Sequence, residues 1–457
     1  MRHYRRAAVA IIGALAFVLL GAWAYRDAHG LSLVVRGANL HGVVRSLAEL
    51  DAVPHVERLV RIPIGRGSMA GRLYMPAQGS NQTVLVVSGL HPAGIDEPRL
   101  IALSRELARS HVTVVTPEIP ELPRFEITPV LTDHIEQAAL WLATNSELSP
   151  TGRIGLMGIS FSGGLAIVAA GRPALRNRLS YVFAFGGHDD LPRVLTYLCT
   201  GIEGGPAIGP WQELDPATVE GPPHDYGVAV VLLNVADHLV PPEQVTLLRD
   251  AVRRFLWASY LDGVDARAAE REFAALRTLA PGLPEPAATL LDSVNNRDVA
   301  HLGPLLLPYV ASHVEAAALS PSRSPAPKAP VLLLHGRHDT VIPAAESLYL
   351  AQRLRTQRVP VRVLLTDLIS HVEADQPVRV IDVRTLLERS ARYFRQHARQ
   401  DQDDAAGGDT VCGKERRSCQ TWQPGCPVQL QLIRPRPKRS RKEPSQMSSL
   451  DSVTRTT

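Results

Sequence analysis

The sequence predicts an α/β fold in which a mainly parallel, doubly wound sheet is covered by helices on both faces. Short apolar runs, typical of strands buried on both sides, alternate with stretches of helical periodicity. The 457 residues, 45% of them hydrophobic, suffice for one large core with an insertion. The formal net charge is only +4, and basic residues concentrate only in the last forty or so, which argues against a nucleic-acid partner.

Residues 1–25 predict a membrane anchor or an export signal. Three arginines precede an apolar run over residues 7–25. As a helix this run would be about 28 Å long, close to the hydrocarbon core of roughly 30 Å. Ala22-Trp23-Ala24 imitates a signal cleavage site, so a cleaved signal is the alternative to the uncleaved anchor that we favour. The arginines predict that the body lies outside the cytoplasm, as a single-pass membrane protein or secreted after cleavage.

The body begins with a juxtamembrane helix within residues 26–55, where Leu40, Val43, Val44, Leu47 and Leu50 recur at helical spacing. The first part of the core covers residues 56–188. Its predicted strands form a hairpin over 56–64 and 71–75 and continue at 83–88, 111–116, up to Ser160, and at 181–185. Its predicted helices lie at 97–110, 131–144 and 165–170.

Ser160 stands between a buried strand and the small-residue opening of a helix, in Gly158-Ile-Ser160-Phe-Ser162-Gly163-Gly164. A serine in such a turn is exposed above the sheet, and small residues must flank it because strand and helix approach closely. Gly158 meets that demand, whereas Ser162 stands where the pattern has a second glycine. The stretch resembles the nucleophile turn of the α/β-hydrolase family. The resemblance covers about residues 56–396 and implies a sheet of α/β-hydrolase type and a serine hydrolase activity.

Residues 189–329 are predicted to be mostly helical, with proline-rich joints and one strand-like run at 227–233. By the resemblance this insertion is a cap over the active site, and the alternative is a separate helical domain. Core-like strands resume at 330–335 and 361–366, with helices at 344–356 and 378–396, so the second part of the core covers 330–398. Residues 399–457 have too little apolar surface to fold and predict a disordered tail.

A serine nucleophile needs a base and a group that orients the base. In the family these follow in the order serine, acid, histidine, each after a later strand. Asp339, in Gly336-Arg-His-Asp339-Thr-Val-Ile-Pro343, follows a buried strand and is similar to the family's acid loop. His371 follows the next strand, about thirty residues further on. The resemblance thus implies a triad of Ser160, His371 and Asp339.

Two residues compete with these assignments. Ser162 is the rival nucleophile, but it lies beyond the apex of the turn if the strand ends at Gly158. Asp237 also follows a strand-like run in a sequence that resembles an acid loop. As the acid it would leave two further core strands before the histidine, so we expect it to cap the helix that starts near Pro242.

The oxyanion of an acyl-transfer reaction needs backbone donors. The resemblance implies the N–H of Phe161, directly after the nucleophile, and that of Leu90 in the loop Ser88-Gly89-Leu90-His91-Pro92. His91 is expected to hold this loop or to line the pocket. Asp96 is expected to cap the following helix, with Glu97 in its first turn.

Other chemistry has weaker signals. Cys199 is the one cysteine of the body and is expected to be a packing residue, while the tail holds the other three. His188-Asp189-Asp190 gathers ligand-type side chains without distant partners, so we assign no metal. The sequence contains no glycine-rich phosphate loop with its lysine, and we assign no cofactor.

Together these features predict a membrane-anchored or exported serine hydrolase. The expected substrate is a small-molecule or lipid-like ester or related acyl compound, and carboxylesterase or lipase-like activity is favoured. A peptidase or thioesterase of the same fold is an alternative. A hydrolase-fold binding protein without turnover is the alternative from another class.

Overall fold

The computed structural model describes residues 42–367, except Arg66, Asn81, 207–222 and 314–316, together with Ser32, Val35 and Arg36. The predicted anchor at 7–25, His371, the helix at 378–396 and the tail at 399–457 lie outside the described residues. Among the helices of the described part, none combines the length and the apolar character needed to cross a membrane.

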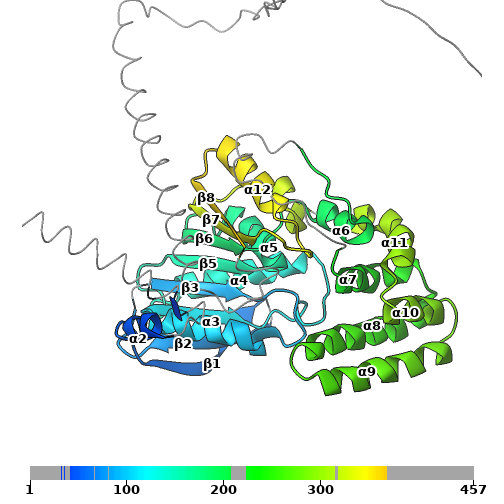
Figure 1. Ribbon diagram of the computed structural model, residues 1–457. Helices are drawn as coiled ribbons and strands as arrows, with labels where there is room; N and C mark the ends of the chain where they lie inside the picture. Colours follow the sequence, from blue (N-terminus) through cyan, green and yellow to red (C-terminus); the bar gives the residue numbers. More distant parts are fainter. Residues whose placement is uncertain are drawn as a thin grey trace, which may run out of the picture. The chain divides into compact units, whose positions relative to one another are not determined.

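Within the described residues a sheet of eight strands forms the centre of the fold, in the order β1-β2-β4-β3-β5-β6-β7-β8 (Figure 1). The strands are β1 His55–Ile64, β2 Gly67–Pro76, β3 Gln82–Val87, β4 Val112–Pro117, β5 Ile154–Ile159, β6 Leu179–Phe185, β7 Val331–Gly336 and β8 Val361–Thr366. β1 and β2 form an antiparallel hairpin, and β2 is also antiparallel to β4. The other neighbouring pairs are parallel, as the apolar runs predicted.

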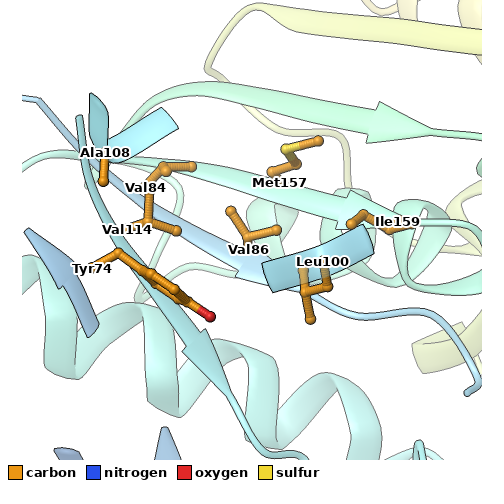
Figure 2. Packing of buried hydrophobic residues seen from close by; sticks show 8 residues of the cluster. All are labelled: Tyr74, Val84, Val86, Leu100, Ala108, Val114, Met157 and Ile159. Atoms are coloured by element: carbon orange, nitrogen blue, oxygen red, sulfur yellow. The ribbon is translucent and has the colours of Figure 1, made fainter. Parts of the chain in front are cut away.

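The helices of the core follow the predicted alternation. They are α3 Pro98–Arg109, α4 Val130–Thr144, α5 Phe161–Gly171 and α12 Ala345–Thr356, and α2, Val43–Glu49, precedes the core within the predicted juxtamembrane segment 26–55. α3 packs on the sheet through an apolar cluster that joins it to β3 and β5 (Figure 2). The cluster contains Tyr74, Val84, Val86, Leu100, Ala108, Val114, Met157 and Ile159. It fixes the carboxyl ends of β3 and β5, and the loops that follow these two strands carry the predicted site residues.

The insertion between β6 and β7 is helical. Its helices are α6 Leu191–Thr200, α7 Tyr226–Val235, α8 Pro242–Asp262, α9 Ala266–Leu279, α10 Ala287–Asn295 and α11 Val299–His313. The strand predicted at 227–233 is wrong, because these residues belong to α7. α7 packs against α6, α8 and α11, and residues 227–235 are all buried. A run that is apolar on every side has no periodicity with which to distinguish a helix from a strand.

Buried charges fix the insertion of residues 189–329, hereafter called the cap, where it leaves β6. Glu346 of α12 accepts hydrogen bonds from the N–H groups of Asp189 (2.9 Å) and Asp190 (3.0 Å), and it pairs with Arg193 of α6. Arg353 of α12 pairs with Asp189 at 2.7 Å. Burial raises the pKa of Glu346, although Arg193 and the two N–H groups act to lower it. Because a lone buried carboxylate would be costly, this network couples the start of the cap to α12.

Candidate active site

Ser160 lies at a sharp turn between β5 and α5, as the sequence motif predicted. Its backbone has φ 55° and ψ −130°, a conformation that residues other than glycine rarely adopt. Its N–H donates to the carbonyl of Phe185 in β6 (2.6 Å), and its carbonyl accepts from the N–H of Gly163 (2.8 Å). The strained turn is therefore held from both the sheet and the helix, with the positive end of α5 directed at the serine.

The close approach of strand and helix is concentrated at two glycines. A Cβ at Gly158 would lie 2.1 Å from the carbonyl oxygen of Ser162, and one at Gly163 would lie 2.8 Å from Cα of Gly187. Position 162 itself accommodates a side chain. Ser162 is fully buried in α5, and its hydroxyl has no hydrogen-bond partner in the described part of the chain. The departure from the glycine pattern thus leaves the turn at Ser160 intact.

A pocket of about 470 Å³ extends from Ser160. The core contributes the loop 88–92 after β3, Ile159 at the end of β5, and Thr340 and Val341, which follow Asp339. The cap contributes His224, Tyr226, Leu256, Ser259, Tyr260, Asp262, Gly263 and Arg297. Three core loops that the sequence assigned to catalysis therefore meet at one pocket. Ser162 does not line it.

The loop after β3 packs directly against the serine. A Cβ at Gly89 would lie 3.1 Å from Cβ of Ser160, so this glycine permits the approach. Leu90 follows Gly89 and lines the pocket. Phe161 is the first residue of α5, so its N–H has no acceptor within the helix. The two predicted oxyanion donors thus belong to backbone segments that flank Ser160.

His91 both holds this loop and lines the pocket. Its Nδ1 accepts from the N–H of Ala93 (3.2 Å), so the proton of the neutral ring is on Nε2. The ring meets Tyr260 of α8 edge to face at 4.7 Å. Burial lowers the pKa of His91 to about 4, although the charge of Glu97 acts to raise it. At neutral pH His91 is therefore an uncharged contact between the loop after β3 and α8 of the insertion.

Asp339 is buried and its loop is fixed. Oδ1 accepts from the N–H groups of Val341 (2.8 Å) and Ile342 (2.9 Å), and Oδ2 lies 3.2 Å from Nε2 of His335. The same Nε2 lies 2.8 Å from the carbonyl oxygen of Ile342, and Nδ1 lies 2.7 Å from Oγ of Ser347. Because a carbonyl only accepts, Nε2 carries the proton and the hydroxyl of Ser347 donates to Nδ1. His335 thus braces the acid loop from the end of β7.

The cap contacts the acid loop at Thr340. The carbonyl of Thr340 accepts from the backbone N–H of His224 (3.0 Å) and from the hydroxyl of Tyr197 (3.3 Å). Both donors belong to the insertion, so the position of the cap and the shape of the acid loop depend on each other.

The rival acid, Asp237, lies elsewhere. It is exposed, forms an ion pair with Arg249 at 2.9 Å, and does not line the pocket. The prediction that it caps α8 is wrong, because Pro241 holds the N-cap position and no side chain caps that end.

Cys199 is buried, and burial raises the pKa of its thiol to about 12, which suits a packing residue and not a nucleophile.

The prediction that Asp96 is the N-cap residue of the following helix, α3, is also wrong. Glu97 holds the N-cap position of α3 and accepts from the N–H of Leu100 (2.6 Å), while Asp96 pairs with Arg72. Pro98 begins the helix and disfavours helical backbone angles at the residue before it, and Glu97, with φ −58° and ψ 122°, is therefore the N-cap.

His188-Asp189-Asp190 serves packing and ion pairing. His188 is fully buried, its Nε2 lies 2.8 Å from the carbonyl of Leu319, and its ring stacks on Phe161 at 5.3 Å. Burial lowers the pKa of His188. Among the described residues, no group of three histidine, cysteine, aspartate or glutamate side chains is arranged to hold a metal ion.

The cap residues of the pocket were not predicted from the sequence. Tyr226 and Tyr260 are helix residues without a motif, and Arg297 follows α10. Arg297 pairs with Asp225 and lies over the ring of Phe273 at 5.4 Å. The residue pattern carried no signal for these positions, because only the packing of the cap helices brings them to Ser160.

The strand order, the turn after β5 and the helical insertion after β6 together define an α/β-hydrolase fold. Neither the family models nor the curated proteins with which the sequence was compared gave a match. Solved structures that match this chain include a carboxylesterase from a metagenomic library, with 15% identity over 79% of this chain and 92% of that chain and a TM-score of 0.42. An esterase from Pyrobaculum calidifontis has 16% identity over 80% and 90%, with a TM-score of 0.40. A dienelactone hydrolase from Anabaena variabilis has 15% identity over 75% and 98%, with a TM-score of 0.35.

Proposed function

We propose that the chain is a serine hydrolase that cleaves an ester or a related acyl bond through an acyl-enzyme. The observation that carries the proposal is the strained turn at Ser160, which adjoins a pocket that the loop of Leu90 and the loop after Asp339 also line. His371 completes the assignment by its place in the sequence, after β8 and about thirty residues beyond Asp339.

In this mechanism the Oγ of Ser160 attacks the substrate carbonyl while the imidazole of His371 takes its proton. The negative charge that develops on the carbonyl oxygen accepts hydrogen bonds from the N–H groups of Phe161 and Leu90. The imidazolium then protonates the leaving group, and Asp339 orients the ring and balances its charge. Water attacks the acyl-enzyme by the same route and restores the serine.

We also propose that residues 7–25 anchor the chain in a membrane with the hydrolase domain outside the cytoplasm; secretion after signal cleavage is the alternative. The length and composition of this run support the anchor. The pocket has both apolar side chains, such as Leu256, and polar ones, such as Tyr260, which suits a small-molecule or lipid-like acyl substrate.

The test is covalent labelling with a fluorophosphonate probe. Wild-type protein and Ser162→Ala should label, and Ser160→Ala should not, because of these two serines only Ser160 lines the pocket, while Ser162 is fully buried in α5. Turnover of matched p-nitrophenyl esters, thioesters and peptide anilides would then separate an esterase from a thioesterase or peptidase. A folded wild-type protein without Ser160-dependent labelling would refute the enzyme and favour a binding protein of hydrolase fold.

A further inference from the structure

Helix α2 directs its charged side chains toward the domain. Arg45 pairs with Glu106 of α3 at 3.1 Å, and Glu49 pairs with Arg109 of the same helix. These contacts attach α2 to α3 through its polar side. A surface helix of a water-soluble domain ordinarily has the opposite arrangement, with its apolar stripe toward the core.

Three aliphatic side chains of α2 and its C-cap are exposed to solvent, whereas Ala48 is buried. Val43 is 77% exposed, Leu47 62% and Leu50, the C-cap residue, 83%. Their spacing of four and three residues places them on one face of a helix. Single exposed leucines are common on protein surfaces, but three strongly exposed aliphatic side chains together on one helix face favour a contact with another apolar phase.

The short connection between the apolar run at 7–25 and the domain determines what lies near the exposed face of α2. The hydroxyl of Ser32 donates to the carbonyl of Ala48 in α2 (2.8 Å), and the buried guanidinium of Arg36 pairs with Glu106 at 3.0 Å. The chain is thus already attached to the domain at residue 32, only seven residues after the end of the apolar run at Tyr25. Seven residues span at most about 25 Å when fully extended. An anchor over residues 7–25 would therefore hold α2 beside the bilayer.

We propose that α2 lies on the membrane surface, with Val43, Leu47 and Leu50 inserted at the boundary between headgroups and acyl chains. The inference rests on the proposed membrane anchor. Lipid is the occupant that the short tether brings to this face in every copy of the chain, at any protein concentration. The contact would fix the orientation of the hydrolase domain relative to the bilayer, which the anchor alone would leave free.

The test uses the full chain in phosphatidylcholine vesicles, with a nitroxide label on Leu47→Cys. Cys412, Cys419 and Cys426 are replaced by serine, and the buried Cys199 is retained. The matched control carries the label on Val264→Cys, a position of similar exposure (63%) in the cap. Power-saturation electron paramagnetic resonance should show several-fold lower access of a nickel chelate, and higher access of oxygen, at 47 than at 264. A label on Val43→Cys should repeat the result if the first variant fails to fold.

The same vesicles separate the possible failures. Resistance to carbonate extraction reports the anchor, and fluorophosphonate labelling reports the hydrolase independently. A chain that resists extraction but exposes the label at 47 as fully as that at 264 overturns the proposal. Protection at 47 that disappears when the protein is diluted in lipid identifies a second copy as the occupant and also overturns it. If carbonate releases the chain, both the anchor and the proposed membrane contact of α2 are refuted. Normal labelling of Ser160 in the same experiment would leave the hydrolase proposal standing.

Discussion

Replacing Asp339 with asparagine should nearly abolish hydrolysis while leaving the fold intact. Oδ1 of Asp339 accepts from the N–H groups of Val341 and Ile342, so the amide oxygen of an asparagine would take that place. The amide nitrogen would then occupy the position of Oδ2, 3.2 Å from Nε2 of His335. The loop would keep its backbone hydrogen bonds, but the carboxylate that we propose orients His371 would become an uncharged amide that donates a hydrogen bond.

The size of the effect follows from the role of the carboxylate. An amide in its place stabilises the wrong tautomer of the histidine, and in a serine protease that change lowers kcat by about 10⁴. We expect a fall of about 10³ to 10⁴ in kcat for Asp339→Asn, which corresponds to about 4–5.5 kcal/mol of activation free energy. Stability should fall by only about 1–2 kcal/mol, because one buried donor would face another at His335.

The assay is the hydrolysis of p-nitrophenyl butyrate, with thermal unfolding as the measure of stability. Asp237→Asn is the matched control, since this carboxylate is exposed and its ion pair with Arg249 contributes at most about 1 kcal/mol. It should retain wild-type activity. An Asp339→Asn enzyme within about tenfold of wild type would refute the assignment, as would loss of activity in Asp237→Asn alone.

Three further predictions concern the surroundings of the site. Gly158→Ala should destabilise the fold by about 3 kcal/mol or more, because its Cβ would lie 2.1 Å from a backbone oxygen, whereas Gly282→Ala, with open space around it, should unfold like wild type. The thiol of Cys199, whose pKa burial raises to about 12, should resist iodoacetamide at pH 8 in the folded protein, and rapid alkylation would contradict its burial. Burial lowers the pKa of His91 to about 4, so between about pH 6.5 and 4 the unfolded chain binds more protons than the folded one. The free energy of unfolding should therefore fall on acidification by up to about 3 kcal/mol, and His91→Gln should make the decline shallower in denaturant titrations; an unchanged slope would refute this account.

The sequence predicted the sheet well because parallel strands buried on both faces leave a distinctive signal. Each of the runs at 83–88, 111–116 and 361–366 became a strand within one residue of the predicted bounds. The same signal misled at 227–233, where α7 is surrounded by other helices and is equally apolar on every side. Complete burial removes the periodicity that distinguishes a helix from a strand, so the residue pattern at 227–233 could not have identified the helix.

The core half of the candidate site was predictable for a geometric reason. Leu90 and Ser160 follow the neighbouring strands β3 and β5, and Asp339 follows β7; the carboxyl ends of parallel strands meet at one edge of a sheet. The cap half was not predictable. Tyr260 and Arg297 reach the pocket through the packing of α8 and the turn after α10, which no local pattern encodes. His371 lies outside the described residues, and its part in the triad stays a prediction.

The contacts between cap and core indicate that the insertion is a structural part of the site and not a removable lid. The carbonyl of Thr340, next to the predicted acid Asp339, accepts hydrogen bonds from two donors in the cap. Asn234 of α7 accepts from the N–H of Ile127 (2.8 Å) and donates to the carbonyl of Phe125 (2.9 Å) in the loop after β4. Glu346 is buried and depends on Arg193 of α6 for its counter-charge. Without the cap these polar groups would lose their partners, and leaving buried groups unpaired costs more than most single contacts contribute. The cap and the residues that follow β7 therefore share hydrogen bonds and ion pairs, so a change that displaces one should also displace the other.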